Sequence, residues 1–488
     1  MIFLITFYLI NKYAKVELFY VLRFIAISIN MKFDAKSNLS SLAFAGMITL
    51  VCAGYSHAQA EEDEASAQSH VSGFVTLGGT YHENPDVGIV FSGAQSKPAY
   101  RGLSTELDSV LGLQWDYKLT PTASVKLQAV ARAGEEYRPN LRLAYAQQEL
   151  GKNLSFRVGR MRSPLFFDSD TSEIGYANTM IRGPVPLYAG TSGGQIAHID
   201  GLHLQWRKPL QDYSLTVNAY WGGGQATHYD FTDAQVNKFL INASGLLNLS
   251  VGLTAGEYLF RYSHTKVANY TANTDPPYQL YESIATASTN FGRLATDFAD
   301  SGLGAEAQAA NEKAKLLSLY SKPFDGAQTY DSIGVSTTIA GFGISGEWTQ
   351  LDADAIMIGK VQGYQLSVNY PLGVFTPYIS IAHNRRISNW ADANPITPTG
   401  LPLFEVLTID AALTDLGNRT AHISRILDSS MRSVTVGLRW DVAPSMAAKI
   451  QYDYLTTPGT ETPGAFKVRS FPFDNAVQLV SVGFDVVF

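Results

Sequence analysis

Apolar and polar residues alternate one by one in short segments along most of this chain. In one such segment Leu111, Leu113, Trp115 and Tyr117 fall on one set of alternate positions, and Gly112, Gln114 and Asp116 fall on the other. Successive side chains of a β-strand point to opposite faces, so this period of two predicts strands with one apolar and one polar face. Short turns alternate with longer connections between the segments, and the last segment reaches Phe488.

Sixteen segments follow the pattern. They are 71–81, 111–117, 125–132, 141–146, 154–158, 202–207, 213–218, 247–251, 258–262, 333–339, 342–348, 366–370, 375–382, 434–440, 450–454 and 480–488. An even number of antiparallel strands with short turns at one end is the layout of a closed transmembrane β-barrel. We therefore predict an all-β fold, an antiparallel barrel of about 16 strands with long extracellular loops. Fourteen or eighteen strands are alternatives, because segment 154–158 is short and Pro377 cannot donate to a ladder.

The longest connections are 162–197, 268–329 and 386–431. The second contains a stretch rich in Ala, Glu and Leu, from Asn290 to Lys315, which predicts a short helix. We interpret it as a cap on an outer loop and not as a functional helix.

The N-terminal region has the features of an export signal. Lys32 and Lys36 precede the apolar stretch 42–53, and Ala58-Gln59-Ala60 has the spacing of a cleavage site. We therefore expect 1–30 to lie upstream of the true start, 31–60 to be a signal peptide, and 61–488 to form the barrel. A membrane anchor beginning at Met1 is the alternative. The single cysteine, Cys52, would leave with the signal, so the mature chain would contain no disulfide.

Composition supports a barrel and argues against several other classes. The chain is 46% apolar and only 16% charged, between the values expected of helical membrane proteins and of soluble enzymes. Its net charge of -7 argues against a nucleic-acid partner. Neither an H-E-x-x-H motif nor a phosphate-binding glycine loop occurs. We expect no enzymatic activity, no metal and no cofactor.

The C-terminal segment resembles the assembly signal of bacterial outer-membrane proteins, with Phe488 preceded by Val486, Phe484, Val482 and Val480 at every second position. With it, the whole mature chain resembles the general porins of Gram-negative bacteria. That resemblance implies a trimer in the outer membrane, contacts with lipid and lipopolysaccharide, and folding by the barrel-assembly machinery. It also implies passive diffusion of small hydrophilic solutes and ions. The third outer loop, 162–197, would fold into the pore, although the family's acidic loop motif is not cleanly present.

Charged residues of the polar faces are candidates for the pore lining. The basic candidates are Lys126, Arg132, Arg142, Arg157, Arg207 and Arg261, and the acidic candidates on the third loop are Asp168, Asp170 and Glu173. Opposed charges of this kind would create a transverse field across a narrow pore. Alternatively, the basic residues pair with Asp116, Glu347, Asp441 and Asp453 within the wall.

Three other functions remain open at this stage. A substrate-selective channel for a sugar, phosphate or carboxylate would share the architecture. A barrel-type hydrolase would need a serine, a histidine and an acid at the rim, and a structural barrel would have a plugged lumen.

Overall fold

The computed structural model describes residues 69–189, 197–232, 235–274, 279–398, 406–459, 462, 464, 466–469, 472 and 474–488. The chain divides into Met1–His57 and Ala58–Phe488, and the barrel belongs to the second unit. The predicted signal peptide lies outside the described residues.

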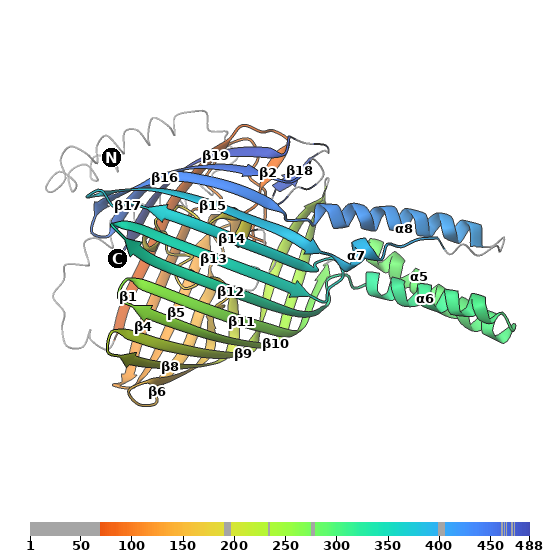
Figure 1. Cartoon of the computed structure of the whole chain (residues 1–488), viewed down its shortest axis with the longest axis horizontal. Coiled ribbons are helices and arrows are strands. Elements are labelled where there is room, and N and C mark those ends of the chain that lie inside the picture. The colour runs from red at the N-terminus through yellow and green to blue at the C-terminus, as the bar shows by residue number, and fades with distance from the viewer. Residues whose placement is uncertain are drawn as a thin grey trace. The chain divides into compact units, whose positions relative to one another are not determined.

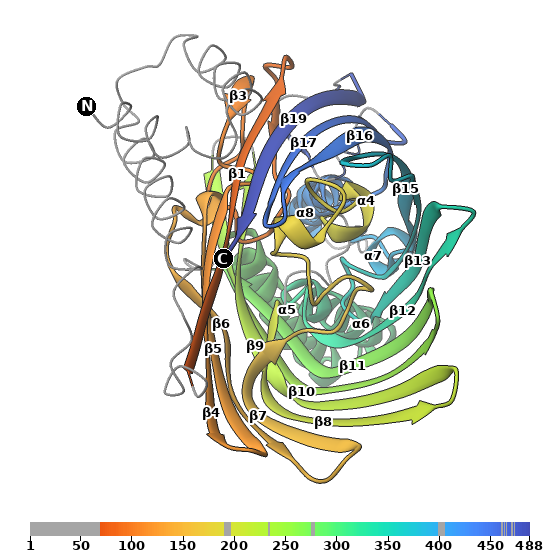
Figure 2. The ribbon, with the colours of Figure 1, turned by 90° about the vertical axis from the view of Figure 1, so that its left-hand side faces the viewer.

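Within the described residues, sixteen antiparallel strands close into one ring (Figures 1 and 2). They are β1 (Ser69–His82), β4 (Val110–Thr120), β5 (Ala123–Arg132), β6 (Asn140–Glu149), β7 (Leu154–Arg162), β8 (His198–Leu210), β9 (Tyr213–Thr232), β10 (Gln235–Ala255), β11 (Tyr258–Thr274), β12 (Gly326–Ile339), β13 (Phe342–Ala353), β14 (Lys360–Asn369), β15 (Phe375–Ser388), β16 (Met431–Ala443), β17 (Met446–Thr456) and β19 (Ala476–Val487). Each strand pairs with the next, and β19 pairs with β1. The predicted fold class and strand number are therefore confirmed.

The two chain ends of the barrel meet where the ring closes. β1 and β19 pair in register from Phe74 opposite Val487 to Tyr81 opposite Val480. The backbone of Phe488 extends this pairing, because its N–H donates to Gly73 O at 3.0 Å and its carbonyl accepts from Gly73 N at 2.7 Å. The last residue of the chain thus takes part in closing the wall.

The wall has a polar inner face and an apolar outer face. On β16 and β17 the side chains of Val436 and Ile450 are 39% and 50% exposed, whereas those of Thr435 and Gln451 are 3% and 1% exposed. The alternation predicted from the sequence therefore points apolar groups outward and polar groups into the barrel. A water-soluble protein has the opposite arrangement, and a barrel surrounded by lipid has this one.

Pro377 lies within β15, as the sequence predicted, and the sheet accommodates it. Its carbonyl accepts from Tyr370 N at 3.1 Å on the β14 side, and it stands opposite Leu438 of β16. Loss of one N–H therefore leaves the ladder continuous on both sides of this strand.

The helical content of the loops differs from the prediction. A helical hairpin of α5 (Gln279–Asp300) and α6 (Gly304–Tyr320) replaces the single short helix expected between Asn290 and Lys315. A third long helix, α8 (Val406–Ile426), follows the four-residue α7 (Trp390–Ala393) in the connection 389–430. All three long helices extend past the end of the barrel opposite the C-terminus (Figure 1). They share a core that includes Leu280, Leu317 and Leu413.

Short additional strands pair outer connections with each other at the end of the barrel from which the long helices extend. β2 (Val87–Ile89) pairs with β18 (Phe466–Val468), and β3 (Gly102–Ser104) pairs with the outer part of β1. The first and last outer connections are thereby joined through Val87, Ile89 and Phe466, which are fully buried or nearly so.

Candidate functional site in the barrel lumen

The connection 163–197 between β7 and β8, hereafter loop 3, enters the ring of strands (Figure 2). Its described part runs to Ala189 and contains the short helix α4 (Val185–Tyr188). Arg261 of β11 donates to Pro164 O at 2.8 Å and to Phe167 O at 3.2 Å. Glu347 of β13 accepts from Phe167 N at 2.7 Å and from the Tyr188 hydroxyl at 3.0 Å. These contacts attach the start of loop 3 and Tyr188 to the far wall.

The middle of loop 3 returns to the strands from which the loop leaves. Glu173 lies between three arginines: Arg132 of β5 at 3.2 Å, Arg142 of β6 at 3.1 Å and Arg162 of β7 at 2.8 Å. Burial by itself would raise the pKa of Glu173, but the three guanidinium groups outweigh it and lower that pKa to about 2. Arg142 also binds Glu135 at 2.7 Å. We call Arg132, Arg142, Arg162 and Glu173 the arginine nest.

A second anchor lies near the end of loop 3. Arg182 pairs with Asp108 at 2.6 Å and with Asp453 of β17 at 2.6 Å, and it donates to Thr80 and Ser481. Burial opposes ionisation of Asp108, yet Arg182 lowers the pKa of this carboxyl below its usual value. Arg182 thus joins loop 3, the connection before β4, and the strands at the barrel closure.

Cations of the wall also hold the backbone of loop 3. Lys449 of β17 donates to Gly175 O at 2.7 Å and Asn178 O at 2.6 Å, and pairs with Asp485 at 2.8 Å. Arg439 of β16 donates to the same Asn178 carbonyl at 2.9 Å. Because these carbonyls bind Lys449 and Arg439, the path of the loop is fixed at several points along the lumen.

An open cavity of about 1140 Å³ remains between loop 3, the first outer connection and the wall. Of the described residues that line it, five are arginines and five are acids: Arg132, Arg138, Arg142, Arg162, Arg182, Asp108, Glu135, Glu136, Asp168 and Glu173. Formal charges therefore cancel around the cavity. Selectivity at this cavity would therefore arise from how the charges are placed and not from an excess of one sign.

The structure brings together only some of the residues predicted to line the pore. Arg132, Arg142 and Glu173 meet in the arginine nest, and Arg261 binds carbonyls of loop 3. Asp168 is exposed and lines the cavity, and Asp170 is exposed on the same loop.

The other predicted residues lie apart from the nest. Lys126 pairs with Asp116 inside the wall at 2.8 Å, which is the alternative arrangement considered from the sequence. Arg157 donates to Gln147 at 2.6 Å and lies over the ring of Tyr145. Arg207 is exposed near the turn that ends β8, at the opposite end of that strand from loop 3. Of the other wall acids, Asp441 pairs with Arg439, whereas Glu347 and Asp453 bind loop 3.

The sequence prediction missed Arg162 and Arg182 as site residues. Arg182 belongs to loop 3, where strand alternation gives no information about side-chain direction, and Arg162 is the last residue of β7, where alternation predicts the outer face. The available signal was that these two cations share one connection with the three acids Asp168, Asp170 and Glu173.

The residues of the predicted assembly signal form part of the closing strand. Val482, Phe484 and Val486 stand opposite Gly79, Leu77 and Val75 of β1, and Phe488 pairs with Gly73. A role in recognition by assembly factors stays a prediction.

The described residues contain no group of three or more His, Cys, Asp or Glu side chains placed to hold a metal ion. No helix in the described segments is long and apolar enough to cross a membrane. Gly190-Thr191-Ser192-Gly193-Gly194 has the G-x-S-x-G spacing of some hydrolases. It lies outside the described residues and supports no proposal.

No family model and no curated protein sequence match this chain. Solved structures similar to it include the outer-membrane channel DcaP of Acinetobacter baumannii, at 10% identity over 86% of this chain and 97% of that one, with a TM-score of 0.47. The anion-selective porin of Comamonas acidovorans is 13% identical over 86% and 100%, with a TM-score of 0.45. In-vitro folded OmpT of Vibrio cholerae, in trimer form, is 11% identical over 86% and 99%, with a TM-score of 0.45.

Proposed function

We propose that this protein is an outer-membrane porin, a water-filled channel through which small hydrophilic solutes and ions diffuse down their gradients. The observation that carries the proposal is the reversed polarity of the closed wall, with polar groups inside and apolar groups outside. Arginine at the lipid midplane costs roughly 2–4 kcal/mol, so the inward-facing cations need an aqueous or protein-lined interior. The charged cavity beside loop 3 supplies such an interior.

Export and assembly form part of this proposal. Cleavage after Ala60 would release a mature chain beginning at Glu61, and the closing strand would present Phe488 to the assembly machinery. A homotrimer embedded in lipid and lipopolysaccharide rests on the resemblance to general porins.

Single-channel recording of the purified barrel in a planar bilayer tests the proposal. We expect stepwise conductance increments in potassium chloride, and none with heat-unfolded protein. A folded barrel that inserts but never conducts would instead support the structural-barrel alternative.

A substrate-selective channel is the second candidate, and the arginine nest favours an anion over a sugar. Three guanidinium groups converge on one carboxylate of the chain itself, and guanidinium matches carboxylate and phosphate geometry. A carboxylate solute could compete for the same donors.

Replacing Arg132, Arg142 and Arg157 together by serine is expected to shift the reversal potential toward cations and to widen the pore. Two of the three removed charges belong to the nest, and without them Glu173 faces the cavity with Arg162 as its remaining partner. Arg207→Ser is the control, because Arg207 lies at the other end of the barrel. A triple variant whose reversal potential in a salt gradient equals that of wild type would exclude the nest as a determinant of selectivity.

A further inference from the structure

The wall is interrupted between β6 and β7 at the end where loop 3 begins. Among neighbouring strands of the described sixteen-strand ring, this pair is joined by the fewest residue pairs, six, from Glu149 opposite Ser155 to Ala144 opposite Arg160. Beyond that point Asn140 and Leu141 pair with β5 only, and Met161 and Arg162 pair with β8 only. We call this gap in the ladder the β6–β7 seam.

Irregular backbone on both strands accounts for the seam. The β5–β6 register shifts at Arg142, which has no partner on β5. On β7, Gly159 has a φ of +129°, and a Cβ there would collide with the carbonyl oxygen of Ala144. Since glycine alone fits this conformation, the divergence of the strands is built into the sequence.

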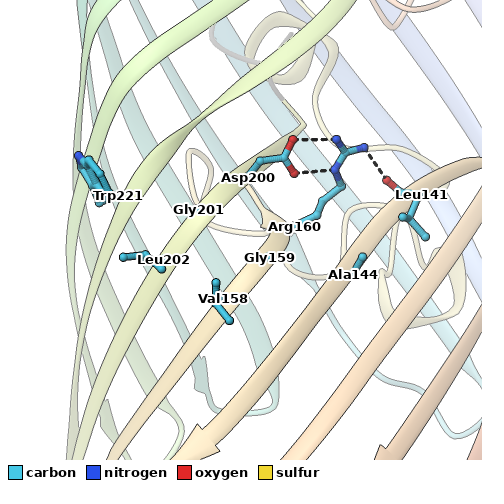
Figure 3. Close-up of a pocket in the computed structure, with 9 residues that line it drawn as sticks. All are labelled: Leu141, Ala144, Val158, Gly159, Arg160, Asp200, Gly201, Leu202 and Trp221. Carbon is cyan, nitrogen blue, oxygen red and sulfur yellow. Dashed lines mark hydrogen bonds and ion pairs between the residues drawn. The ribbon is translucent and has the colours of Figure 1, made fainter.

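Charged side chains bridge the seam on each face of the wall, through a hydrogen bond outside and ion pairs inside. On the outer face Arg160 binds Asp200 of β8 through two hydrogen bonds of 2.7 Å and also donates to Leu141 O of β6 at 3.2 Å (Figure 3). On the inner face Glu173 of loop 3 joins Arg142 of β6 to Arg162 of β7. No backbone ladder links the two strands at this level, so these side chains hold the wall together.

Side-chain directions show that the seam passes through the wall. Arg160 and Arg162 fall on the same face of β7 by alternation. Arg160 nevertheless binds Asp200 beside the outward-facing Leu202, whereas Arg162 reaches Glu173 and the buried Gln128 of the lumen. A residue of the outer face can reach the interior only where the adjacent strand has separated.

A hollow lies on each side of the seam. The outer one has a volume of about 660 Å³ and is lined by Leu141, Ala144, Val158, Gly159, Arg160, Asp200, Gly201, Leu202 and Trp221 (Figure 3). The inner one is the lumen cavity, which Arg142 and Arg162 line. One hollow is thus mainly apolar and faces outward, and the other presents guanidinium groups.

We propose that the β6–β7 seam is a lateral entry site for amphipathic carboxylates, with the head group in the arginine nest and the alkyl tail in the outer hollow. The proposal rests on the membrane placement of the proposed function but adds a second route, from the lipid side. An incoming carboxylate would replace that of Glu173 on Arg142 and Arg162, so that both guanidinium groups stay paired while Glu173 keeps Arg132. Release of Glu173 opens the inner bridge, and the tail passes beside Arg160.

Fluorescence quenching by 12-bromododecanoate tests this site, because bromine quenches an indole that it touches. Trp221 lines the outer hollow. The difference in quenching between the wild type and Trp221→Phe gives the contribution of this residue. We expect quenching by 12-bromododecanoate to saturate as its concentration rises. Quenching by 12-bromododecanol, which lacks the charge, should not saturate. Arg162→Gln should raise the half-saturating concentration about tenfold, since a hydrogen bond to a charged group is lost. Asp116→Asn, which breaks a wall ion pair elsewhere, should leave it unchanged.

A crosslink distinguishes passage through the seam from binding on the surface. Leu141→Cys with Asp200→Cys, joined by a short bismaleimide, would bridge the seam, and quenching should be lost on crosslinking while ion conductance persists. Ala146→Cys with Leu202→Cys is the matched pair on the same two strands, at a level where the β6–β7 ladder is intact. Equal quenching by acid and alcohol would identify partition into lipid only and overturn the proposal, as would quenching that survives the crosslink. If the wild-type protein does not conduct ions at all, that result rejects the diffusion channel and leaves the lateral entry site standing.

Discussion

Replacing Arg182 by methionine is expected to lower the free energy of unfolding of the barrel by about 3–5 kcal/mol, the usual effect of leaving a buried ion pair without one partner. The side chains of Asp108 and Asp453 are 6% and 1% exposed, so each would keep a buried charge without the ion pair to Arg182. Methionine preserves much of the volume of arginine, which separates loss of charge from loss of packing. Denaturant titration of the barrel in detergent micelles, followed by tryptophan fluorescence, measures the change.

Arg138→Ala is the control for this experiment. Arg138 pairs with Glu136 at 2.6 Å but is 73% exposed, and exposed pairs contribute only about 0–1 kcal/mol. A further variant with Arg182→Met, Asp108→Asn and Asp453→Asn removes the unpaired charges and should recover part of the loss. If Arg182→Met unfolds at the same denaturant concentration as Arg138→Ala, the anchor contributes nothing to stability.

The same anchor predicts how acid affects the barrel. Because the pKa of Asp108 is lowered in the folded state, its ionised carboxylate stabilises the fold. Its contribution to the free energy of unfolding is complete above the unfolded pKa of 3.8 and decreases as the pH falls below that value. Loop 3 should therefore stay attached near Arg182 throughout the neutral range.

The sequence predicted the wall well because the wall is decided locally. Alternation at every second position sets which side chains face outward, and all sixteen segments, including the short one at 154–158, are strands. The lengths were less predictable: β9 and β10 have 20 and 21 residues, far more than the segments at 213–218 and 247–251. Their outer halves lose the simple alternation around the bulge between Ala243 and Leu246.

The contacts of loop 3 could not be predicted in this way because they join distant parts of the chain. Arg182 and Ser481 are 299 positions apart, and their contact depends on closure of the whole ring. The alternation of side chains along the strands predicted that Arg132 and Arg142 lie inside the barrel. It could not identify Glu173, and not Asp168 or Asp170, as their partner. The same alternation predicts the wrong face for Arg162, which reaches the lumen only because the β6–β7 ladder stops beside it.

Replacing Glu173 by glutamine is expected to shift the reversal potential of the channel toward anions. Formal charges around the cavity cancel in the wild type, and this substitution leaves one positive charge in excess where three guanidinium groups converge. The like charges of Arg132, Arg142 and Arg162 would then repel one another in a partly buried site, and the central part of loop 3 would lose its link to β5, β6 and β7. Larger and noisier single-channel currents should accompany the change in selectivity.

Acid gives an independent test of the same carboxylate. The pKa of Glu173 is about 2 in the folded state and 4.5 in the unfolded state. Its contribution to the free energy of unfolding is therefore complete above pH 4.5 and is lost only as the pH falls through about 2. Wild-type selectivity controlled by Glu173 should therefore be nearly constant between pH 7 and about pH 3.5, because a group is still mostly ionised more than one unit above its pKa. An ordinary exposed glutamate would be mostly protonated at the acid end of that range.

Asp170→Asn is the matched control for Glu173→Gln. Asp170 is an exposed acid of the same loop, and the ion pairs of the arginine nest among the described residues involve Glu173 and Glu135 instead. Both substitutions remove one negative charge, so a general electrostatic effect would shift the two reversal potentials equally. A shift confined to Glu173→Gln would assign selectivity to the nest, and equal shifts would assign it to the summed charge of loop 3.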